Sequence, residues 1–526
     1  MISTIRVARL NALMKPNVIM ILADQLHAGW MGCAGHPQAL TPEFDAFAAS
    51  GMRFEKAYCQ NPICTPSRVS ILSGQYAQNH GYYGLSGPAP LGLDNIFRHF
   101  RRHGYRTAAY GKLHLPESPR NWIADDVDEF GDCYESADGA CATSEFLSGL
   151  DAKGLREQED SWHNTTGFYS PNTIPMDARP SALPFEETLE MWCAKKAMAF
   201  MSQADERPFC MQIAFQKPHH PLFPNERFWN LYPEDLALPS HWDANAGERP
   251  PHFQKMKAGA RNMKPEFGKP GESFEDFLRR SWRGTLACVS QIDHVFGLLL
   301  RFLKERGLDK NTIVILGSDH GAYHGHFGLM EKAPGICSDA VCRVPMIWKV
   351  PGVTPEGSVC SQLVENIDMA PTLAKLCGLP DFDSADGLDI TPLLKNEDRA
   401  VHEIALTENV WSKSIRWKNW RFVHYSSRMF EEGDFGELYN LEEDPWESRN
   451  LYSDPQHQGL VASLRRRLLE HLIETRRTVT THPTVKNEPG LDWDPGARFT
   501  YPVCDDGTAP NPAQARNRDT LNINYV

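Results

Sequence analysis

The sequence lacks the features that mark three common classes of protein. It has no CxxC pair among thirteen cysteines, and their odd number leaves at least one unpaired in a monomer. We therefore expect free thiols rather than a disulfide framework. No stretch approaches the ~18 apolar residues that a bilayer-spanning helix needs, so we expect no membrane partner. The net charge of −13 argues against nucleic acid as a partner.

The features that are present are typical of a large globular chain. A length of 526 residues allows a sizeable core in one or two domains. A hydrophobic fraction of 41% and a charged fraction of 23% place the chain among ordinary soluble globular proteins. Function must therefore be sought in local motifs rather than in overall composition.

The segment CTPSR at residues 64–68 predicts a nucleophile beside an anion site. Pro66 fits the first turn of a short helix that Gly74 can end, which places Cys64 at the N-terminal mouth. Cys64 and Arg68 are four residues apart and then share one helix face. Free N–H groups favour an anion there, and Arg68 adds a planar fork suited to sulfate or phosphate oxygens. The alternative is a buried thiol with an ordinary packing role.

This segment resembles the C-x-P-S-R signature of the type I sulfatases of the alkaline phosphatase superfamily. A second segment, from Leu438 to Asn450, matches the family pattern LYNL-x-x-DP-x-E-x-x-N. In that family the cysteine is oxidised after translation to formylglycine, whose hydrate is the nucleophile. The resemblance therefore implies that Cys64 is converted by a formylglycine-generating enzyme.

Two continuous apolar runs, each typical of a buried parallel strand, end next to polar pairs. Asp24-Gln25 follows the run at residues 17–23, and Asp319-His320 follows another. Ligands collect at the carboxyl ends of parallel strands, and two carboxylates brought together there repel each other unless a cation lies between them. For either pair alone, the alternative is an aspartate that caps the next helix.

The resemblance implies that these two pairs bind one divalent metal ion. Its ligands would be Asp24, Gln25, Asp319 and His320, with the group formed from Cys64. Oxygen ligands suit Ca²⁺, Mg²⁺ and Mn²⁺. We expect calcium, the usual metal of the family, with Mn²⁺ or Mg²⁺ as the alternatives. Pairs that contain Gln and His also occur in phosphonate monoester hydrolases that use manganese.

Four further residues match catalytic positions of the family. Lys112 and His114 flank a leucine, so they point the same way if the backbone is extended there. By resemblance, Lys112 contacts formylglycine and sulfate, and His114 holds the formylglycine hydroxyl. His219 and Lys332 are expected to bind the sulfate and protonate the leaving oxygen. Taken alone, each of the four is as readily a surface or core residue.

The chain departs from the family in one place. The family commonly has a histidine at the position of Phe327. His324 and His326 lie close by, and His220 follows one of the matched histidines. The sequence assigns no role to these three.

The order of the elements predicts an α/β fold with a large, mixed, mostly parallel sheet flanked by helices, followed by a smaller C-terminal α+β domain with a short antiparallel sheet. The predicted parts are a catalytic domain at 14–398, a C-terminal domain at 399–485 and an extended tail at 486–526. Strands are expected at 17–23, 105–110, 209–215, 312–316, 344–348, 404–408, 413–417 and 420–425, and helices at 41–50, 93–103, 185–202, 274–306, 366–377 and 460–476. Residues 125–184 are expected to form loops, and residues 239–275 a long irregular insertion.

We predict a sulfatase that hydrolyses a carbohydrate or aryl sulfate monoester. One rival is a phosphonate or phosphate ester hydrolase on the same scaffold, which Gln25 and His320 favour and Ser67 opposes. The other is a catalytically silent binder of sulfated glycans. A sugar substrate is suggested by tryptophans that can stack on sugar rings or simply pack: Trp122, Trp162, Trp229 and Trp242.

Two expectations concern the setting of the enzyme. The apolar run before Asp24 cannot be a discarded signal segment if Asp24 binds metal, so we expect a cytoplasmic protein, with periplasmic export as the alternative. The long tail at 486–526 suggests a homo-oligomer. The expected partners are therefore a small sulfated substrate, the maturation enzyme and a second copy of the chain.

Overall fold

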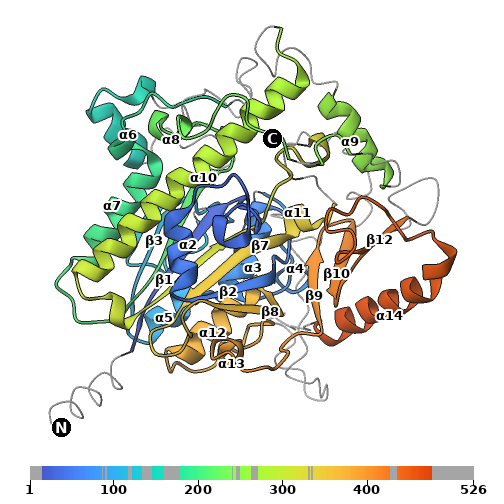
Figure 1. Cartoon of the computed structure of the whole chain (residues 1–526). Helices are drawn as coiled ribbons and strands as arrows, with labels where there is room; N and C mark the ends of the chain where they lie inside the picture. Colours follow the sequence, from blue (N-terminus) through green and yellow to red (C-terminus); the bar gives the residue numbers. More distant parts are fainter. Residues whose placement is uncertain are drawn as a thin grey trace, which may run out of the picture.

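A large central sheet organises the protein, which a computed structural model describes over residues 15–476 (Figure 1). Within that span, the residues outside the described set are 86, 89, 91, 117–120, 133–144, 159–177, 240, 245–248, 262–270, 330–331, 333–335 and 427–434. The strands of the sheet are β1 (Asn17–Asp24), β2 (Met52–Tyr58), β3 (Arg106–Gly111), β4 (Glu129–Asp132), β5 (Phe209–Pro218), β6 (Thr312–Ser318), β7 (Arg343–Lys349) and β8 (Ser358–Glu365). Their order across the sheet is β4-β3-β5-β1-β6-β7-β2-β8.

The sheet is mixed but mostly parallel, as predicted. Strand β7 runs antiparallel to both of its neighbours, β6 and β2. The pairs β1–β5, β1–β6, β3–β5, β3–β4 and β2–β8 are parallel. Every residue of β1 is buried, which explains why this strand appears in the sequence as a continuous apolar run.

Helices cover both faces of the sheet (Figure 1). The α-helices that follow or precede its strands are α2 (Pro42–Ala49), α3 (Cys64–Ser73), α4 (Ala77–His80), α5 (Ile96–Arg102), α6 (Glu145–Ala152), α7 (Leu189–Met201), α8 (Glu226–Trp229), α9 (Pro251–Arg261), α10 (Phe274–Glu305), α11 (Asp339–Cys342), α12 (Met369–Leu376) and α13 (Thr391–Leu394). Ile19 and Ile21 of β1 lie in one core with α2, α7 and α10. Val18 and Met20 lie in the other core with α3, α5 and α12. Because successive side chains of β1 point to opposite faces of the sheet, this strand contributes to both cores.

Single 3-10 turns connect several of these elements. They are η1 (Gly32–Ala34), η3 (Arg156–Gln158), η5 (Phe185–Glu187), η7 (Asp309–Asn311), η8 (His326–Gly328), η9 (Asn366–Asp368) and η10 (Pro455–His457). The predicted helix at 185–202 is therefore the turn η5 followed by α7, and the predicted helix at 366–377 is η9 followed by α12.

Helix α10 changes one expectation drawn from the sequence. Its 32 residues include an 18-residue window whose mean hydropathy of 1.4 meets the length and composition needed to cross a membrane. In the structure, 72% of that window is buried inside the protein. Helix α10 is therefore a core helix of the protein, and its apolar face packs against α2, α7 and β5.

A second, smaller sheet follows the first along the chain. Its strands are β9 (Ile404–Glu408), β10 (Ser412–Trp417), β11 (Trp420–Tyr425) and β12 (Gly436–Asn440), all antiparallel to their neighbours in the order β12-β11-β10-β9. Helix α14 (Gln458–Glu474) packs on it through Leu464 and Leu468, which meet Ile415 and Phe422. The short antiparallel sheet of the predicted α+β domain is confirmed. The domain boundaries stay predictions, and the tail at 486–526 lies outside the described residues.

Several elements differ from the sequence prediction. Strands β2 and β8, at one end of the sheet, were not expected, because each mixes exposed residues with buried ones and neither gives a continuous apolar run. The region predicted as loops, 125–184, contains β4 and α6, although residues 133–144 and 159–177 lie outside the described set. The predicted irregular insertion at 239–275 contains helix α9, in a polar segment whose many proline, glycine and lysine residues favoured an irregular structure.

A buried polar cluster joins the two sheets. The Nε2 atom of His402 lies 3.0 and 2.9 Å from the two carboxylate oxygens of Asp368, and its Nδ1 atom lies 3.7 Å from Glu365. Glu365 also accepts hydrogen bonds from the Tyr76 hydroxyl at 2.6 Å and from the Leu406 backbone of β9 at 2.7 Å. Because β8 ends at Glu365, this cluster fixes the start of the small sheet to the large one.

We expect His402→Gln to destabilise the protein in a pH-dependent way. Burial lowers the pKa of His402, but Asp368 and Glu365 outweigh it and raise the pKa to about 9. Since the folded pKa lies above the unfolded value of about 6.5, the stabilisation is complete below that pH and is lost as the pH rises through about 9. The difference in free energy of unfolding between the two proteins should be about 3 kcal/mol at pH 6.

Urea unfolding at pH 6, 7.5 and 9 checks this expectation. The gap between the wild type and His402→Gln should shrink towards pH 9. His457→Gln is the matched control, because His457 is a partly exposed histidine paired with Asp454 outside the cluster. A gap that stays constant over this pH range would contradict the assignment.

Candidate active site and metal centre

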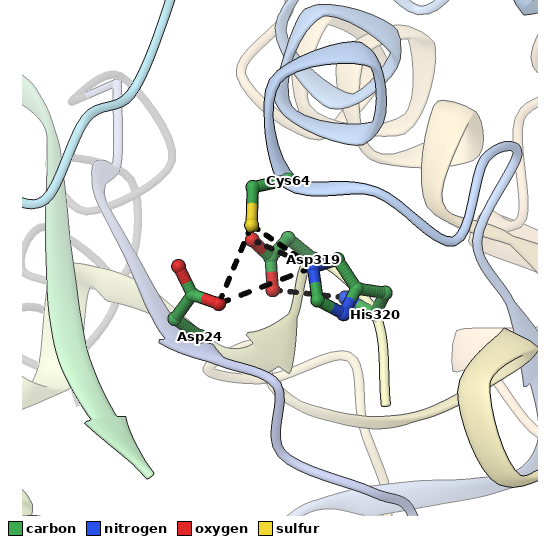
Figure 2. Close-up of side chains that lie close together, drawn as sticks. All are labelled: Asp24, Cys64, Asp319 and His320. Carbon is green, nitrogen blue, oxygen red and sulfur yellow. Dashed lines mark hydrogen bonds and ion pairs between the residues drawn. The ribbon is translucent and has the colours of Figure 1, made fainter. Parts of the chain in front are cut away.

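Four buried side chains converge where the central strands end (Figure 2). Asp24 is the last residue of β1, and Asp319 and His320 directly follow β6. Because β1 and β6 are parallel neighbours, their carboxyl ends meet at the same edge of the sheet. Cys64 opens helix α3 and reaches the same point, with its Sγ 3.7 Å from Asp24 Oδ1. One ligand atom from each of the four lies within 4.8 Å of every other.

Helix α3 has the form that the sequence predicts. It begins at Cys64, after the extended residue Ile63, and ends at Ser73. Gly74 closes it at φ 67°, and an added Cβ there would lie 2.8 Å from Ala385. Both the left-handed conformation and this close approach require glycine. Every residue of α3 is buried, so the cysteine is presented from a rigid support.

Arg68 lies between the two aspartates. Its Nη2 atom is 3.0 Å from Asp24 Oδ2, and its Nε atom is 2.9 Å from Asp319 Oδ2. Its Nη1 atom donates to the backbone carbonyl of Lys112. The sequence predicted that this guanidinium would clamp a sulfate or phosphate group. The structure instead directs it at carboxylates, so we interpret Arg68 as the group that holds these two aspartates together.

Two lysines add positive charge around Cys64. Lys112 Nζ lies 2.6 Å from Asp24 Oδ2, and Lys332 Nζ lies 3.3 Å from Cys64 Sγ. Burial and the Asp24 carboxylate both raise the pKa of the Cys64 thiol, but Lys332, Lys112 and His320 outweigh them, so this pKa lies below its ordinary value. The site thus favours negative charge at position 64.

Hydrogen bonds define the orientation of two histidines. The Nδ1 atom of His320 lies 2.8 Å from the carbonyl oxygen of Gly321, which can only accept, so Nδ1 carries a hydrogen. Its Nε2 atom faces Cys64 Sγ at 3.2 Å. In the same way, His219 Nδ1 donates to the carbonyl of His220 at 2.7 Å. Burial, followed by the charge of Lys112, lowers the pKa of His219.

His114 is close enough to the charged groups of the site to be affected by them, but its backbone does not have the conformation assumed from the sequence. Its backbone has φ 42°, so the extended conformation assumed for the segment from Lys112 to His114 does not hold. Burial lowers the pKa of His114, and the charges of Lys112 and Arg68 lower it further. The imidazole is therefore held neutral beside a cationic cluster.

Gln25 depends on a histidine to which the sequence assigned no role. The Nε2 atom of His324 lies 3.4 Å from Gln25 Oε1, and its Nδ1 atom lies 2.8 Å from the Thr285 hydroxyl of α10. The only sign of this contact in the sequence was Thr285, a polar residue within the long, largely apolar helix α10. His326, by contrast, stacks on Trp446 with ring centroids 4.6 Å apart.

The donor set fits a divalent cation. Two carboxylates, an imidazole nitrogen and the group at position 64 converge, and oxygen-rich sets of this kind suit Ca²⁺, Mg²⁺ or Mn²⁺. The hydrogen bond from Nδ1 of His320 to a carbonyl is the arrangement that fixes the tautomer of a metal-binding histidine. Burial raises the pKa of Asp24, but Lys112, His219, Arg68 and His320 outweigh it, so this carboxyl stays ionised.

The tryptophans proposed as sugar platforms are engaged elsewhere. Trp229 is buried, and the guanidinium of Arg283 lies 4.4 Å from the centre of its ring. Trp122 and Trp242 are partly buried and pack against apolar clusters. Trp162 lies outside the described residues. These contacts agree with the packing alternative, and stacking on a sugar stays a prediction for Trp122 and Trp242, which are partly exposed.

Comparison with known proteins identifies two family models that together span most of the chain. The model described as Sulfatase matches residues 16–379. A second, described as N-sulphoglucosamine sulphohydrolase, C-terminal, matches residues 325–474. The two matches cover the large sheet and the small one.

Individual relatives agree with these matches. An arylsulfatase of Clostridium perfringens is 27% identical over 490 residues, which covers 87% of this chain and 95% of the relative. A choline-sulfatase of Rhizobium meliloti is 26% identical over 461 residues, covering 84% and 83% respectively. Among solved structures, a phosphonate monoester hydrolase of Agrobacterium radiobacter superimposes with a TM-score of 0.72 at 21% identity, covering 89% of this chain and 98% of that one. At this identity, that likeness concerns the fold alone.

Proposed function

Because this chain belongs to the sulfatase family, we propose that it hydrolyses a sulfate monoester through a formylglycine hydrate at position 64 and one divalent metal ion. The observation that carries the proposal is the convergence of Cys64 with Asp24, Asp319 and His320 at one buried point. A hydrated aldehyde there supplies one hydroxyl that can attack sulfur and a second whose deprotonation releases the bound sulfate. A thiol or a serine hydroxyl lacks this second step.

The metal would be held by Asp24, Gln25, Asp319 and His320, together with the group at position 64. Bound there, it supplies positive charge against the sulfuryl oxygens and the attacking hydroxyl. We propose calcium first, with Mn²⁺ or Mg²⁺ as alternatives. His324 positions the Gln25 amide, so it belongs to the support of this ligand set rather than to the reacting groups.

The chain itself contributes charge and a proton. Lys112 and Lys332 lie on either side of the Asp24–Cys64 contact and can neutralise the sulfuryl oxygens. A general acid must also protonate the leaving oxygen. Burial and neighbouring lysines hold His219 neutral, with a hydrogen only on the Nδ1 atom that the His220 carbonyl uses. The ammonium of Lys332 is therefore the better proton donor.

We expect Lys332→Met to reduce kcat/KM by an amount that depends on the leaving group. For an alkyl or sugar sulfate, the loss should be about 10²- to 10⁴-fold, because the departing alkoxide then lacks a proton donor. For 4-nitrophenyl sulfate, whose leaving group needs little protonation, the loss should be much smaller. Equal losses on both substrates would assign Lys332 to sulfate binding instead. His219→Asn serves as the comparison.

Peptide mass spectrometry across residue 64, after expression with a formylglycine-generating enzyme, tests the nucleophile. The peptide should carry an aldehyde in place of the thiol, and the amount of aldehyde should scale with activity on aryl sulfates. A fully active sample that retains the Cys64 thiol would overturn the proposal.

A phosphonate or phosphate ester hydrolase is the second candidate. The presence of Gln25 and His320 in the proposed ligand set supports this candidate, and His320 Nε2 lies 3.2 Å from Cys64 Sγ. Rates on matched 4-nitrophenyl sulfate, phosphate and phenylphosphonate separate the two. We expect the sulfate to have the highest kcat/KM.

The natural substrate is proposed only as a class. A small carbohydrate or aryl sulfate is the proposed class, because two lysines and the neutral His114 surround the position of the sulfate group. A cytoplasmic location and a homo-oligomeric state remain part of the proposal, and size-exclusion chromatography with light scattering tests the second.

A further inference from the structure

A cavity of about 420 Å³ lies at the seam between the two sheets, apart from the catalytic centre. Its walls come from the segment after β1, from β2 and β7 of the large sheet, and from β10 and the segments after β10 and β12 in the small domain. Its charged lining residues are four basic ones, Arg53, Lys56, Arg343 and Arg416, and three acidic ones, Glu55, Asp339 and Glu442. None of the residues assigned above to the nucleophile, the metal or the proton donor lines it.

Arg416 is the unusual member of this wall. It is only 6% exposed, and its Nε and Nη1 atoms have no hydrogen-bond partner among the described residues. In β10 it stands directly opposite Arg421 of β11. Arg421 forms ion pairs with both Asp339 and Glu447. Two like charges therefore face each other across the strands, and only one of them is compensated.

The neighbouring charges do not compensate Arg416 either. Arg53 pairs with Glu55 at 3.4 Å. Arg343 Nε lies 3.8 Å from Asp339, the carboxylate that Arg421 already uses. Glu442 accepts a hydrogen bond from the neutral amide of Asn419 and forms no ion pair with Arg416 among the described residues. Together with Lys56, the wall carries more positive charge than its own carboxylates balance.

We propose that this cavity binds a sulfate-type oxyanion, with the guanidinium of Arg416 as its main contact. Burial of an arginine without a partner is unfavourable unless an anion accepts its hydrogen bonds. The planar fork of arginine matches the spacing of oxygens on a tetrahedral anion. Arg53, Lys56 and Arg343 supply the remaining positive charge. The volume exceeds that of an inorganic ion, so the group can also belong to a small organic sulfate.

The site is independent of the reaction proposed above, because none of the groups proposed to react lines it. Its occupant can come from two sources: inorganic sulfate or the sulfate group of a small ester. Isothermal titration calorimetry with sodium sulfate and with methyl sulfate, at constant ionic strength, distinguishes them. The expected result is a binding event that Arg416→Gln weakens about 10- to 100-fold, because a charge-assisted pair is lost.

Two variants make the test specific. Arg466→Gln removes the same charge from an exposed site on α14 and should leave the titration unchanged. Lys56→Gln lies on the other wall and should weaken binding in the same sense, so the proposal stays testable if Arg416→Gln does not fold. Turnover of 4-nitrophenyl sulfate at saturating substrate should be retained in both cavity variants, which separates this site from the catalytic one.

Crystals soaked in selenate provide the direct readout. An anomalous peak within hydrogen-bonding distance of Arg416 Nη1, lost in Arg416→Gln, is the expected result. The proposal is overturned if wild-type crystals show selenate elsewhere but not in this cavity. It is equally overturned if both cavity variants titrate like the wild type.

Discussion

Cys64→Ala should lower kcat/KM for an aryl sulfate by about 10⁴- to 10⁶-fold, the range expected when a nucleophile is removed. Alanine has no group that can be oxidised to an aldehyde, so the proposed nucleophile cannot form at position 64. The surroundings of Cys64 are otherwise unchanged by the substitution, since α3 is anchored by its own buried residues. Folding should therefore be retained, and binding of the substrate should survive the loss of turnover.

Cys33→Ala is the matched control. Burial, together with the nearby Asp45 carboxylate, raises the pKa of the Cys33 thiol to about 12, so this cysteine is a poor nucleophile and should tolerate replacement with little change in rate. Rates with 4-nitrophenyl sulfate, measured on both variants after expression with the maturation enzyme, check the pair. Substantial turnover by Cys64→Ala would mean that another group attacks sulfur.

Arg68→Met should destabilise the protein by about 3–5 kcal/mol and abolish most of its activity, because two fully buried carboxylates lose their shared partner. Asp24 would keep Lys112 at 2.6 Å, but Asp319 would lose its only ion pair with an arginine or lysine among the described residues. The two aspartates would then repel each other across the site. Chemical unfolding in the presence of a chelator should show the loss in full.

The same variant gives a readout specific to this arrangement. Added Ca²⁺ should restore more stability to Arg68→Met than to the wild type, since a cation between the carboxylates can substitute for the missing guanidinium. Arg466→Met, at an exposed position on α14, should show neither effect. If Arg68→Met lost little stability and did not respond to metal, the role of Arg68 between the aspartates would be refuted.

The centre of the sheet could be predicted from the sequence because its strands are buried on both faces. β1 and β6 appear as apolar runs, β5 as a mainly apolar segment interrupted by Gln212, and the polar residues at their ends mark where they stop. Strands β2 and β8, at one end of the sheet, carry no such signal. β2 exposes Glu55 and half-buries Arg53 and Lys56, which breaks both the apolar run and a clean alternation. Helix α9 was missed for a different reason, because it is polar overall and lies in a segment with many proline, glycine and lysine residues.

The convergence of several predicted site residues could be foreseen from the sequence, but the orientation of their side chains could not. Local motifs select Asp24, Cys64 and Asp319, and the parallel sheet brings them together. Which way Arg68 turns depends on carboxylates forty and more residues away, so the helix alone suggested an anion clamp. His324 gave no motif, since its role arises from contacts with Gln25 and with a threonine of α10.

The depth of Cys64 has a consequence for the order of events during biosynthesis. The cysteine is 1% exposed, and groups that enclose it, including Asp319 and Lys332, are encoded more than 250 residues later. An enzyme that oxidises this side chain needs it accessible, which the finished fold prevents. We therefore expect conversion to take place while the nascent chain is still open, and the aldehyde to be sealed in place when the second half of the polypeptide closes over it.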